Sequence, residues 1–143
     1  MPRQAWRMQT VMPKAMQFMK IAWASPCSLV GLLLGLIILL LGGKARCGGA
    51  IEFCLREGVA NCGAIEKSLP YRAITFGHII IAITAEELEC IRAHELVHVQ
   101  QYERWGIFFF PAYLGSSLWQ LLRGRQVYWD NYFEVQARQQ SVH

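Results

Sequence analysis

Charged side chains are scarce in this chain of 143 residues: they make up 17%, whereas hydrophobic residues make up 54%. Soluble domains typically contain about 25% charged residues, so the composition leans away from an ordinary soluble domain. No run of lysine or arginine occurs and the net charge is only +4, so no nucleic-acid partner is expected. The length allows one compact domain with a membrane anchor and is too short for two ordinary domains.

The cysteines also lack a regular pattern. There are five, and no CxxC pair occurs among them. These features argue against a zinc ribbon and against a regular disulfide framework. We expect mostly reduced, partly buried thiols. The alternative is a Cys47–Cys54 or a Cys54–Cys62 disulfide, if this segment lies outside the cytoplasm.

A long segment without charge lies at residues 21–43, with the sequence IAWASPCSLVGLLLGLIILLLGG. At ~1.5 Å per helical residue it is long enough to cross a bilayer core of ~30 Å. We expect a transmembrane anchor, because the alternative, a signal peptide, would need a cleavage site that is not evident. Residues 1–20 are basic and contain no acidic residue. They favour a cytoplasmic N-terminus only slightly, so the sequence does not assign the domain to one side of the membrane.

The remaining residues, 48–143, are expected to form one α+β domain. Residues 50–55 alternate between apolar and polar side chains, and residues 73–82 are rich in β-branched side chains. Both patterns are typical of strands. We therefore predict a small antiparallel sheet, followed by one long helix and two shorter ones.

The clearest helix is predicted from Thr84 to Trp105, because threonine is a good N-cap, Glu87 completes a capping box, and a glycine follows the last residue. A second helix is expected over residues 111–124 and a third over 131–140. The apolar segment 107–122 is too short and interrupted for a second membrane span. It belongs either to the core or to the membrane interface.

The predicted long helix contains an HExxH motif, His94-Glu95-Leu96-Val97-His98. A helix turns ~100° per residue, so the two histidines lie ~40° apart on one face and can reach one ion. They point along the apolar stripe, where a zinc ion would satisfy imidazole nitrogens that are costly to bury unpaired. Glu95 is rotated away from the metal, in the position of a general base. The alternative is a pair of core histidines that bond to neighbouring side chains.

A catalytic zinc site needs a third protein ligand besides two histidines. The longer metzincin motif does not apply, because Gln101 and Arg104 stand where glycine and histidine are required. The remaining candidates are Glu134, Asp130, His143, Glu103 and His78. Glu103 faces away from the apolar stripe, and His78 is the best histidine alternative.

The segment 93–101, AHELVHVQQ, resembles the active-site helix of gluzincin-type zinc metallopeptidases. It is especially similar to small bacterial peptidase-like domains that read HELxHVxQQ, and the resemblance covers roughly residues 73–138. In that group a later helix beginning N-P-x-E, followed by an alanine, supplies a glutamate ligand. Here Asn131, Glu134 and Ala137 match, and Tyr132 replaces the proline. The competing interpretation of Asn131 and Glu134 is a capping box that needs no metal.

The resemblance implies a zincin-type fold in which His94, His98 and Glu134 bind Zn²⁺ and Glu95 is catalytic. It implies a membrane-anchored peptidase that hydrolyses a peptide or protein substrate laid along the strand at 73–82. The candidate donors to a developing oxyanion are Tyr102, Tyr128 and Tyr132. The alternative function is a catalytically inactive, zinc-binding membrane scaffold, because a resemblance in fold does not establish activity.

Overall fold

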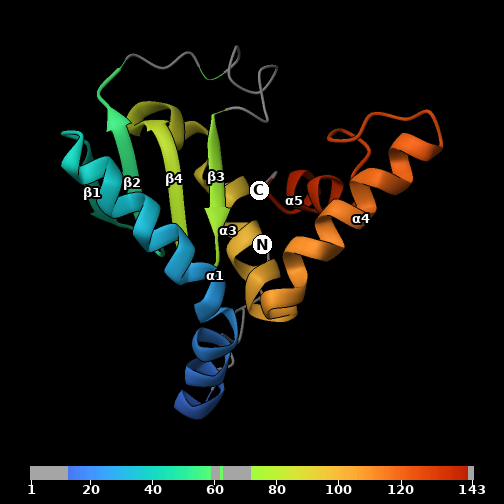
Figure 1. Cartoon of the computed structure of the whole chain (residues 1–143), viewed down its shortest axis with the longest axis horizontal. Helices are drawn as coiled ribbons and strands as arrows, with labels where there is room; N and C mark the ends of the chain where they lie inside the picture. Colours follow the sequence, from blue (N-terminus) through green and yellow to red (C-terminus); the bar gives the residue numbers. More distant parts are fainter. Residues whose placement is uncertain (1–12, 59–61, 63–71, 142–143) are drawn as a thin grey trace, which may run out of the picture.

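The computed structural model describes residues 13–58, 62 and 72–141. A four-stranded sheet lies between helix α1 (Lys14–Leu40) on one face and helix α3 (Ala85–Trp105) on the other (Figure 1). The strands are β1 (Lys44–Cys47), β2 (Ile51–Arg56), β3 (Ala73–Phe76) and β4 (Ile79–Thr84), in the order β1-β2-β4-β3. A 3-10 turn η1 (Gly106–Phe108) leads into α4 (Phe109–Leu122) and α5 (Tyr132–Ser141). The α+β prediction is confirmed at this level.

The sheet is mixed, so the prediction of an antiparallel sheet is wrong for one pair of strands. β1 pairs antiparallel with β2 and β3 with β4, but β2 runs parallel to β4. The strand predicted at 73–82 is in fact a hairpin that turns at Gly77, where φ is 61°. Glycine adopts this conformation readily because it has no Cβ. Strand propensity did not reveal this turn, because β-branched residues stand on both sides of Gly77.

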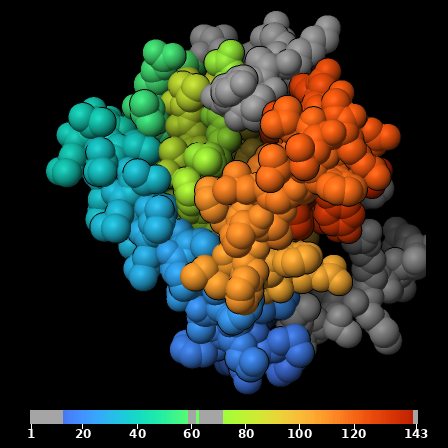
Figure 2. All heavy atoms as spheres, turned by 45° about the vertical axis from the view of Figure 1, so that its right-hand side comes forward, coloured from blue at the N-terminus to red at the C-terminus, as the bar shows by residue number. Residues whose placement is uncertain are grey.

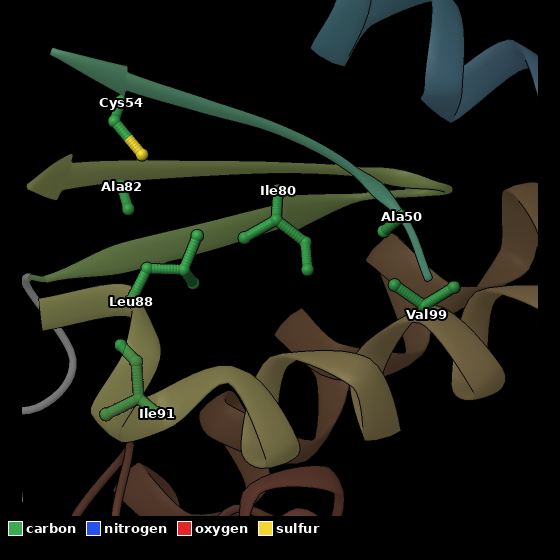
Figure 3. Close-up of a cluster of buried hydrophobic side chains, with 7 residues drawn as sticks. All are labelled: Ala50, Cys54, Ile80, Ala82, Leu88, Ile91 and Val99. Atoms are coloured by element: carbon green, nitrogen blue, oxygen red, sulfur yellow. The ribbon is translucent and has the colours of Figure 1, made fainter. Parts of the chain in front are cut away.

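Helix α3 begins and ends at the predicted residues, but the capping box is not completed, because among the described contacts the Glu87 side chain does not bond back to Thr84. The hydroxyl of Thr84 accepts a hydrogen bond of 3.1 Å from the backbone N–H of Glu87, and Gly106 ends the helix with φ 57°. The Glu87 carboxylate accepts a hydrogen bond of 2.9 Å from Arg72. The inner side of α3 packs on the sheet through a buried cluster (Figure 3), which consists of Ala50, Cys54, Ile80, Ala82, Leu88, Ile91 and Val99.

Helix α1 packs against the opposite face of the sheet through two glycines. A Cβ at Gly31 would lie 2.7 Å from the Cβ of Ile79, and a Cβ at Gly35 would overlap the ring of Phe53. The helix begins at Lys14, just after Pro13, so residues 14–20 extend the predicted apolar segment as part of one helix. Of the described helices, α1 is the one long and apolar enough to cross a membrane.

A disulfide joins Cys62 to Cys90, whereas Cys27, Cys47 and Cys54 are free. Neither of the two pairings considered from the sequence forms. The register of β1 and β2 explains why Cys47 and Cys54 do not pair, because Cys47 lies opposite Ile51 and Cys54 lies opposite Lys44. The pairing of Cys90 on α3 with a residue 28 positions earlier depends on tertiary packing that no local pattern reveals.

Candidate metal centre

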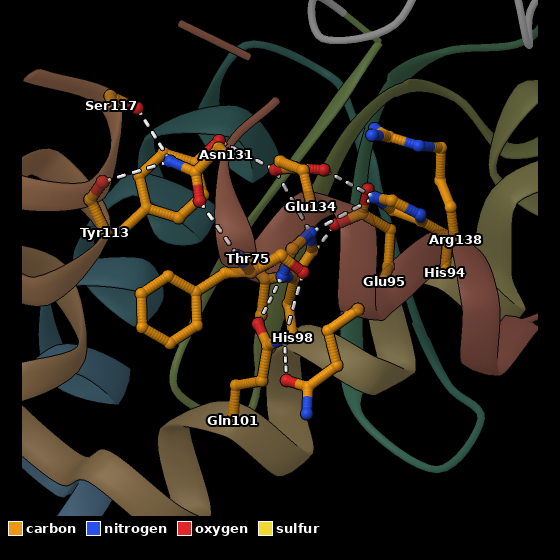
Figure 4. A network of polar contacts seen from close by, with 12 residues as sticks. Thr75, His94, Glu95, His98, Gln101, Tyr113, Ser117, Asn131, Glu134 and Arg138 are labelled. Atoms are coloured by element: carbon orange, nitrogen blue, oxygen red, sulfur yellow. Dashed lines mark hydrogen bonds and ion pairs between the residues drawn. The ribbon is translucent and has the colours of Figure 1, made fainter. Parts of the chain in front are cut away.

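Helices α3 and α5 bring three ligating side chains to one point (Figure 4). His94 Nε2 lies 3.0 Å from Glu134 Oε2 and 3.1 Å from His98 Nε2, and His98 Nε2 lies 3.4 Å from Glu134 Oε1. All three residues are buried, with exposed fractions of 6%, 7% and 3% for His94, His98 and Glu134. This buried group could hold a metal ion.

The spacing and chemistry of these three side chains fit a zinc ion. Ligand atoms that each lie ~2.0–2.1 Å from a tetrahedral ion are ~3.3 Å from one another. The separations here are 3.0 to 3.4 Å, and the two that involve Glu134 end on different carboxylate oxygens, so the group has the size of such a site. Two imidazoles and one carboxylate are a known ligand set of catalytic zinc sites, which leave a fourth position for water or substrate.

Gln101 fixes the orientation of the His98 ring. Its side-chain Nε2 donates to the carbonyl of Phe133 at 3.0 Å and to Gln136 Oε1 at 2.8 Å, so its Oε1 must face His98. That oxygen lies 2.8 Å from His98 Nδ1, which therefore carries the proton. In the neutral ring the lone pair of His98 is then on Nε2, the atom that points toward His94 and Glu134, whereas the protonated ring donates from Nε2 to Glu134. Such partners fix the tautomer and orientation of metal-binding histidines.

The Glu134 carboxylate is held in its charged form. Burial raises its pKa, but hydrogen bonds from His94 and His98 outweigh that effect and hold the pKa well below the usual range. Tyr113 adds a hydrogen bond of 2.7 Å to Oε1. Burial also lowers the pKa of His98, and its hydrogen bond with Glu134 and the charge of Glu95 raise it by more. An ionised carboxylate beside two imidazoles is the state in which Glu134 can act as a ligand.

Asn131 caps α5 without help from Glu134. Its Oδ1 accepts a hydrogen bond of 2.9 Å from the N–H of Phe133, while its Nδ2 donates to the carbonyl of Tyr113 and to Ser117 Oγ. Asn131 is fully buried and joins α4 to the start of α5. The Glu134 side chain turns instead to the histidines, so the cap forms but the capping box does not account for Glu134.

Glu95 lies next to this group, on the wall of a cavity of about 190 Å³. Thr75 on β3 donates a hydrogen bond of 2.7 Å to Glu95 Oε2, and Glu95 is 4% exposed. The cavity is lined by residues of β3, α3, α4, the loop before α5 and α5: Ala73, Ile74, Thr75, Phe76, Glu95, His98, Tyr102, Phe109, Phe110, Tyr113, Tyr128 and Glu134. The edge of the sheet, a candidate base and two of the candidate ligands thus share one cavity.

The other candidate ligands do not join the group. His78 lies in the turn between β3 and β4, where its Nε2 is 3.3 Å from Glu103 Oε1. Asp130 accepts a hydrogen bond of 3.0 Å from the N–H of Gln126. His143 lies outside the described residues. The structure therefore groups Glu134, and not His78, with the two motif histidines.

Three polar residues of the site had no assigned role in the sequence argument. Gln101 has a visible signal, because it belongs to the HELxHVxQQ pattern, but Thr75 and Tyr113 have none. Of the tyrosines considered as donors, Tyr102 and Tyr128 line the cavity and Tyr132 is 62% exposed. Burial, followed by the charge of Glu134, raises the pKa of both Tyr113 and Tyr128, so both hydroxyls stay protonated and able to donate.

Comparison with family models, with curated proteins and with solved structures finds no match to this chain.

Proposed function

We propose that the chain is a membrane-anchored zinc metallopeptidase of the gluzincin type. The observation that carries this proposal is the group formed by His94, His98 and Glu134, with Glu95 beside it on the cavity wall. These residues would hold one Zn²⁺. When bound, the ion would supply Lewis-acid chemistry, because it acidifies water and polarises a carbonyl group.

In this proposal, Glu95 accepts a proton from the attacking water. Its hydrogen bond from Thr75 holds one carboxylate oxygen, and its position on the cavity wall suits a group that must meet water. Tyr113 and Tyr128 are the candidate donors to a developing oxyanion, because both line the cavity. General-base catalysis of this kind typically contributes about 10²–10⁴-fold.

An extended peptide is the substrate that the cavity suits best. Among the described strands β3 pairs with β4 alone, and its four residues line the cavity. A peptide that adds to a sheet edge gains main-chain hydrogen bonds, and its carbonyl groups then lie at defined positions along the strand. This arrangement supports hydrolysis of a peptide bond next to Glu95.

The alternative is a zinc-binding scaffold without catalytic turnover. A structural zinc site usually has four protein ligands, whereas the metal-binding group in the described part of the chain has three members. A structural site also has no need of Glu95, which is buried on the cavity wall at a cost in desolvation. Both features favour the enzyme.

Two measurements test the enzyme against the scaffold. Purified full-length protein should contain about one zinc per chain by elemental mass spectrometry, as expected for a single mononuclear site. Glu95→Gln should keep that zinc and lower the hydrolysis of a peptide library by about 10²–10⁴-fold. Glu89→Gln is the matched control, because Glu89 lies on the same helix with a half-exposed side chain, and it should leave hydrolysis unchanged.

Three outcomes would count against the proposal. Zinc content that does not change in a His94→Ala/His98→Ala double variant would eliminate the metal site. A wild-type protein that binds zinc but cleaves no peptide would favour the scaffold. Equal hydrolysis by the wild type and Glu95→Gln would show that Glu95 is not the general base.

Membrane attachment through α1 is the second part of the proposal. The span of α1 has few buried residues, and most of its leucines are exposed. The full-length protein should therefore stay in the membrane fraction after a carbonate wash. Recovery of the full-length protein in the soluble fraction without detergent would contradict this part.

A further inference from the structure

The sheet face that carries α1 is apolar along all four strands. Successive side chains of a strand point to opposite faces of the sheet, and residues that are partners on neighbouring strands point to the same face. The face toward α1 contains Ala45, Cys47, Ile51, Phe53, Leu55, Ile74, Phe76, Ile79, Ile81 and Ile83. The opposite face, toward α3, has the charged residues of the strands, which are Lys44, Arg46, Glu52 and Arg56.

Helix α1 covers only part of this apolar sheet face. Phe53 and Ile79 are buried, but Ile51, Leu55 and Ile74 are 39%, 48% and 50% exposed. Soluble proteins normally bury the apolar face of a sheet and rarely expose large apolar patches. The uncovered strands therefore indicate an apolar surrounding on this side of the molecule.

Helix α4 extends the same surface beyond the sheet. Residues 107–122 contain no charged side chain, and eight of their large apolar residues are exposed: Ile107, Phe108, Phe110, Leu114, Leu118, Trp119, Leu121 and Leu122. The turn η1, which leads into α4, meets α1 where the rings of Phe108 and Trp23 lie 6.0 Å apart. Figure 2 shows α1 and α4 on one side of the molecule with strands between them. We call these exposed residues of α1, the sheet and α4 the apolar surface.

The mouth of the cavity belongs to this apolar surface. Ile74 and Phe76 line the cavity from β3, and Phe110 lines it from α4. Ile74 and Phe110 are each about half exposed, at 50% and 49%. A substrate that enters between β3 and α4 therefore passes apolar side chains that are continuous with both helices.

The distribution of charge favours lipid as the partner of the apolar surface. Basic residues stand near the ends of this surface at Lys14, Arg123 and Arg125, and also at Lys44, which is paired with Glu57. Basic side chains at the ends of apolar helices suit lipid headgroups. With 14 residues, α4 is ~21 Å long. That is too short to cross a bilayer core of ~30 Å, so it would lie in one leaflet or at its interface.

We propose that the cavity opens onto the lipid bilayer, and that its substrates are polypeptide segments that reach it from the membrane. The substrate class is an extended, apolar segment of a membrane-embedded or membrane-adsorbed polypeptide. This inference rests on the proposed peptidase function. It adds that α4 and the sheet contact lipid together with α1, so the domain is seated against the membrane and is not held away from it on a stalk.

Lipid photo-crosslinking of the full-length protein in vesicles tests the surface. A phospholipid with a photoactivatable group in its acyl chain should label peptides from 107–122 and from β2 or β3, in addition to α1. The exposed Tyr132 on α5 is outside the apolar surface, and its peptide should stay unlabelled. Labelling confined to α1 would overturn the inference. Cross-links between two chains at α4, in place of lipid labelling, would overturn it in favour of a dimer.

Activity tests the substrate class separately. The same peptide is offered free in solution and bound to vesicles through an acyl chain. The wild type should cleave the bound form at least about tenfold faster, because confinement raises the effective concentration at a membrane-facing site. Leu114→Gln/Leu118→Gln changes exposed residues of α4 that do not line the cavity. It should remove this advantage while cleavage of the soluble peptide continues, and Tyr132→Gln is the matched control.

The outcomes separate this inference from the function on which it rests. Equal rates for the two forms of the peptide would overturn the membrane-facing substrate class and leave the peptidase proposal intact. If neither form is cleaved by zinc-loaded protein, the peptidase proposal fails and the substrate class fails with it. In that case, the lipid labelling still decides whether the apolar surface contacts the bilayer.

Discussion

Two clusters of histidine and glutamate side chains lie along α3, and only one of them has the geometry of a metal site. In the first, ring nitrogens of His94 and His98 and the carboxylate of Glu134 meet at separations of 3.0 to 3.4 Å. In the second, His78 Nε2 lies 3.3 Å from Glu103 Oε1, and Lys20 Nζ lies 3.2 Å from Glu103 Oε2. Both contain a histidine and a carboxylate, so residue type alone does not separate them.

The two clusters differ in the partners of their ring nitrogens and carboxylate oxygens. In the His78 cluster, each polar atom has its own partner, because Lys20 supplies a cation to Glu103 and Ser28 Oγ lies 3.4 Å from His78 Nδ1. In the His94 cluster, three potential acceptor atoms converge in a buried place where no lysine or arginine pairs with Glu134 among the described contacts. Convergence without a resident cation distinguishes a ligand set from an ordinary ion pair.

The largest expected effect comes from removing one potential ligand side chain from each cluster. Glu134→Ala should abolish stoichiometric zinc binding, because it removes one of three protein ligands and leaves only two histidines. His78→Ala is the matched change in the second cluster and should leave about one zinc per chain. Elemental analysis of both purified variants measures this. Tight zinc binding by Glu134→Ala would mean that another group completes the site.

A smaller effect is expected from the residue that orients His98. Gln101→Leu keeps the side-chain size but removes the acceptor for His98 Nδ1, so zinc affinity should fall by about 10–100-fold. The neighbouring Gln100 is exposed, and Gln100→Leu should not change the affinity. Competition with a chromophoric chelator measures both. Equal affinities for the two variants would show that the tautomer of His98 does not depend on Gln101.

The smallest effect is expected in the second cluster. Glu103→Gln removes the charge that pairs with Lys20 and His78, but these side chains are 22–32% exposed. Partly exposed ion pairs contribute little, so the free energy of unfolding should fall by no more than about 1 kcal/mol. Denaturant unfolding in detergent measures the change, and zinc content should stay the same. A loss of zinc in this variant would show that the two clusters are coupled.

Several local features of this protein were predictable because short-range rules govern them. The N-cap at Thr84, the end of α3 at Gly106 and the shared face of His94 and His98 all follow from hydrogen bonding and periodicity within a few turns. The long apolar segment of α1 was visible for the same reason. In contrast, the turn at Gly77 was hidden, because strand-forming residues continue on both sides of it.

The helix that could bind a metal was recognisable from the HExxH motif, since helical periodicity places both of its histidines on one side. The tertiary structure was needed to place Glu134, and not His78, beside the two histidines, because this depends on which residues of α3 are contacted by α5 and which by the β3–β4 turn. The same holds for the Cys62–Cys90 disulfide, for the parallel pairing of β2 with β4, and for the hydrogen bond from Thr75 to Glu95. Each of these joins residues far apart in the chain, and their meeting is set by the packing of the whole domain.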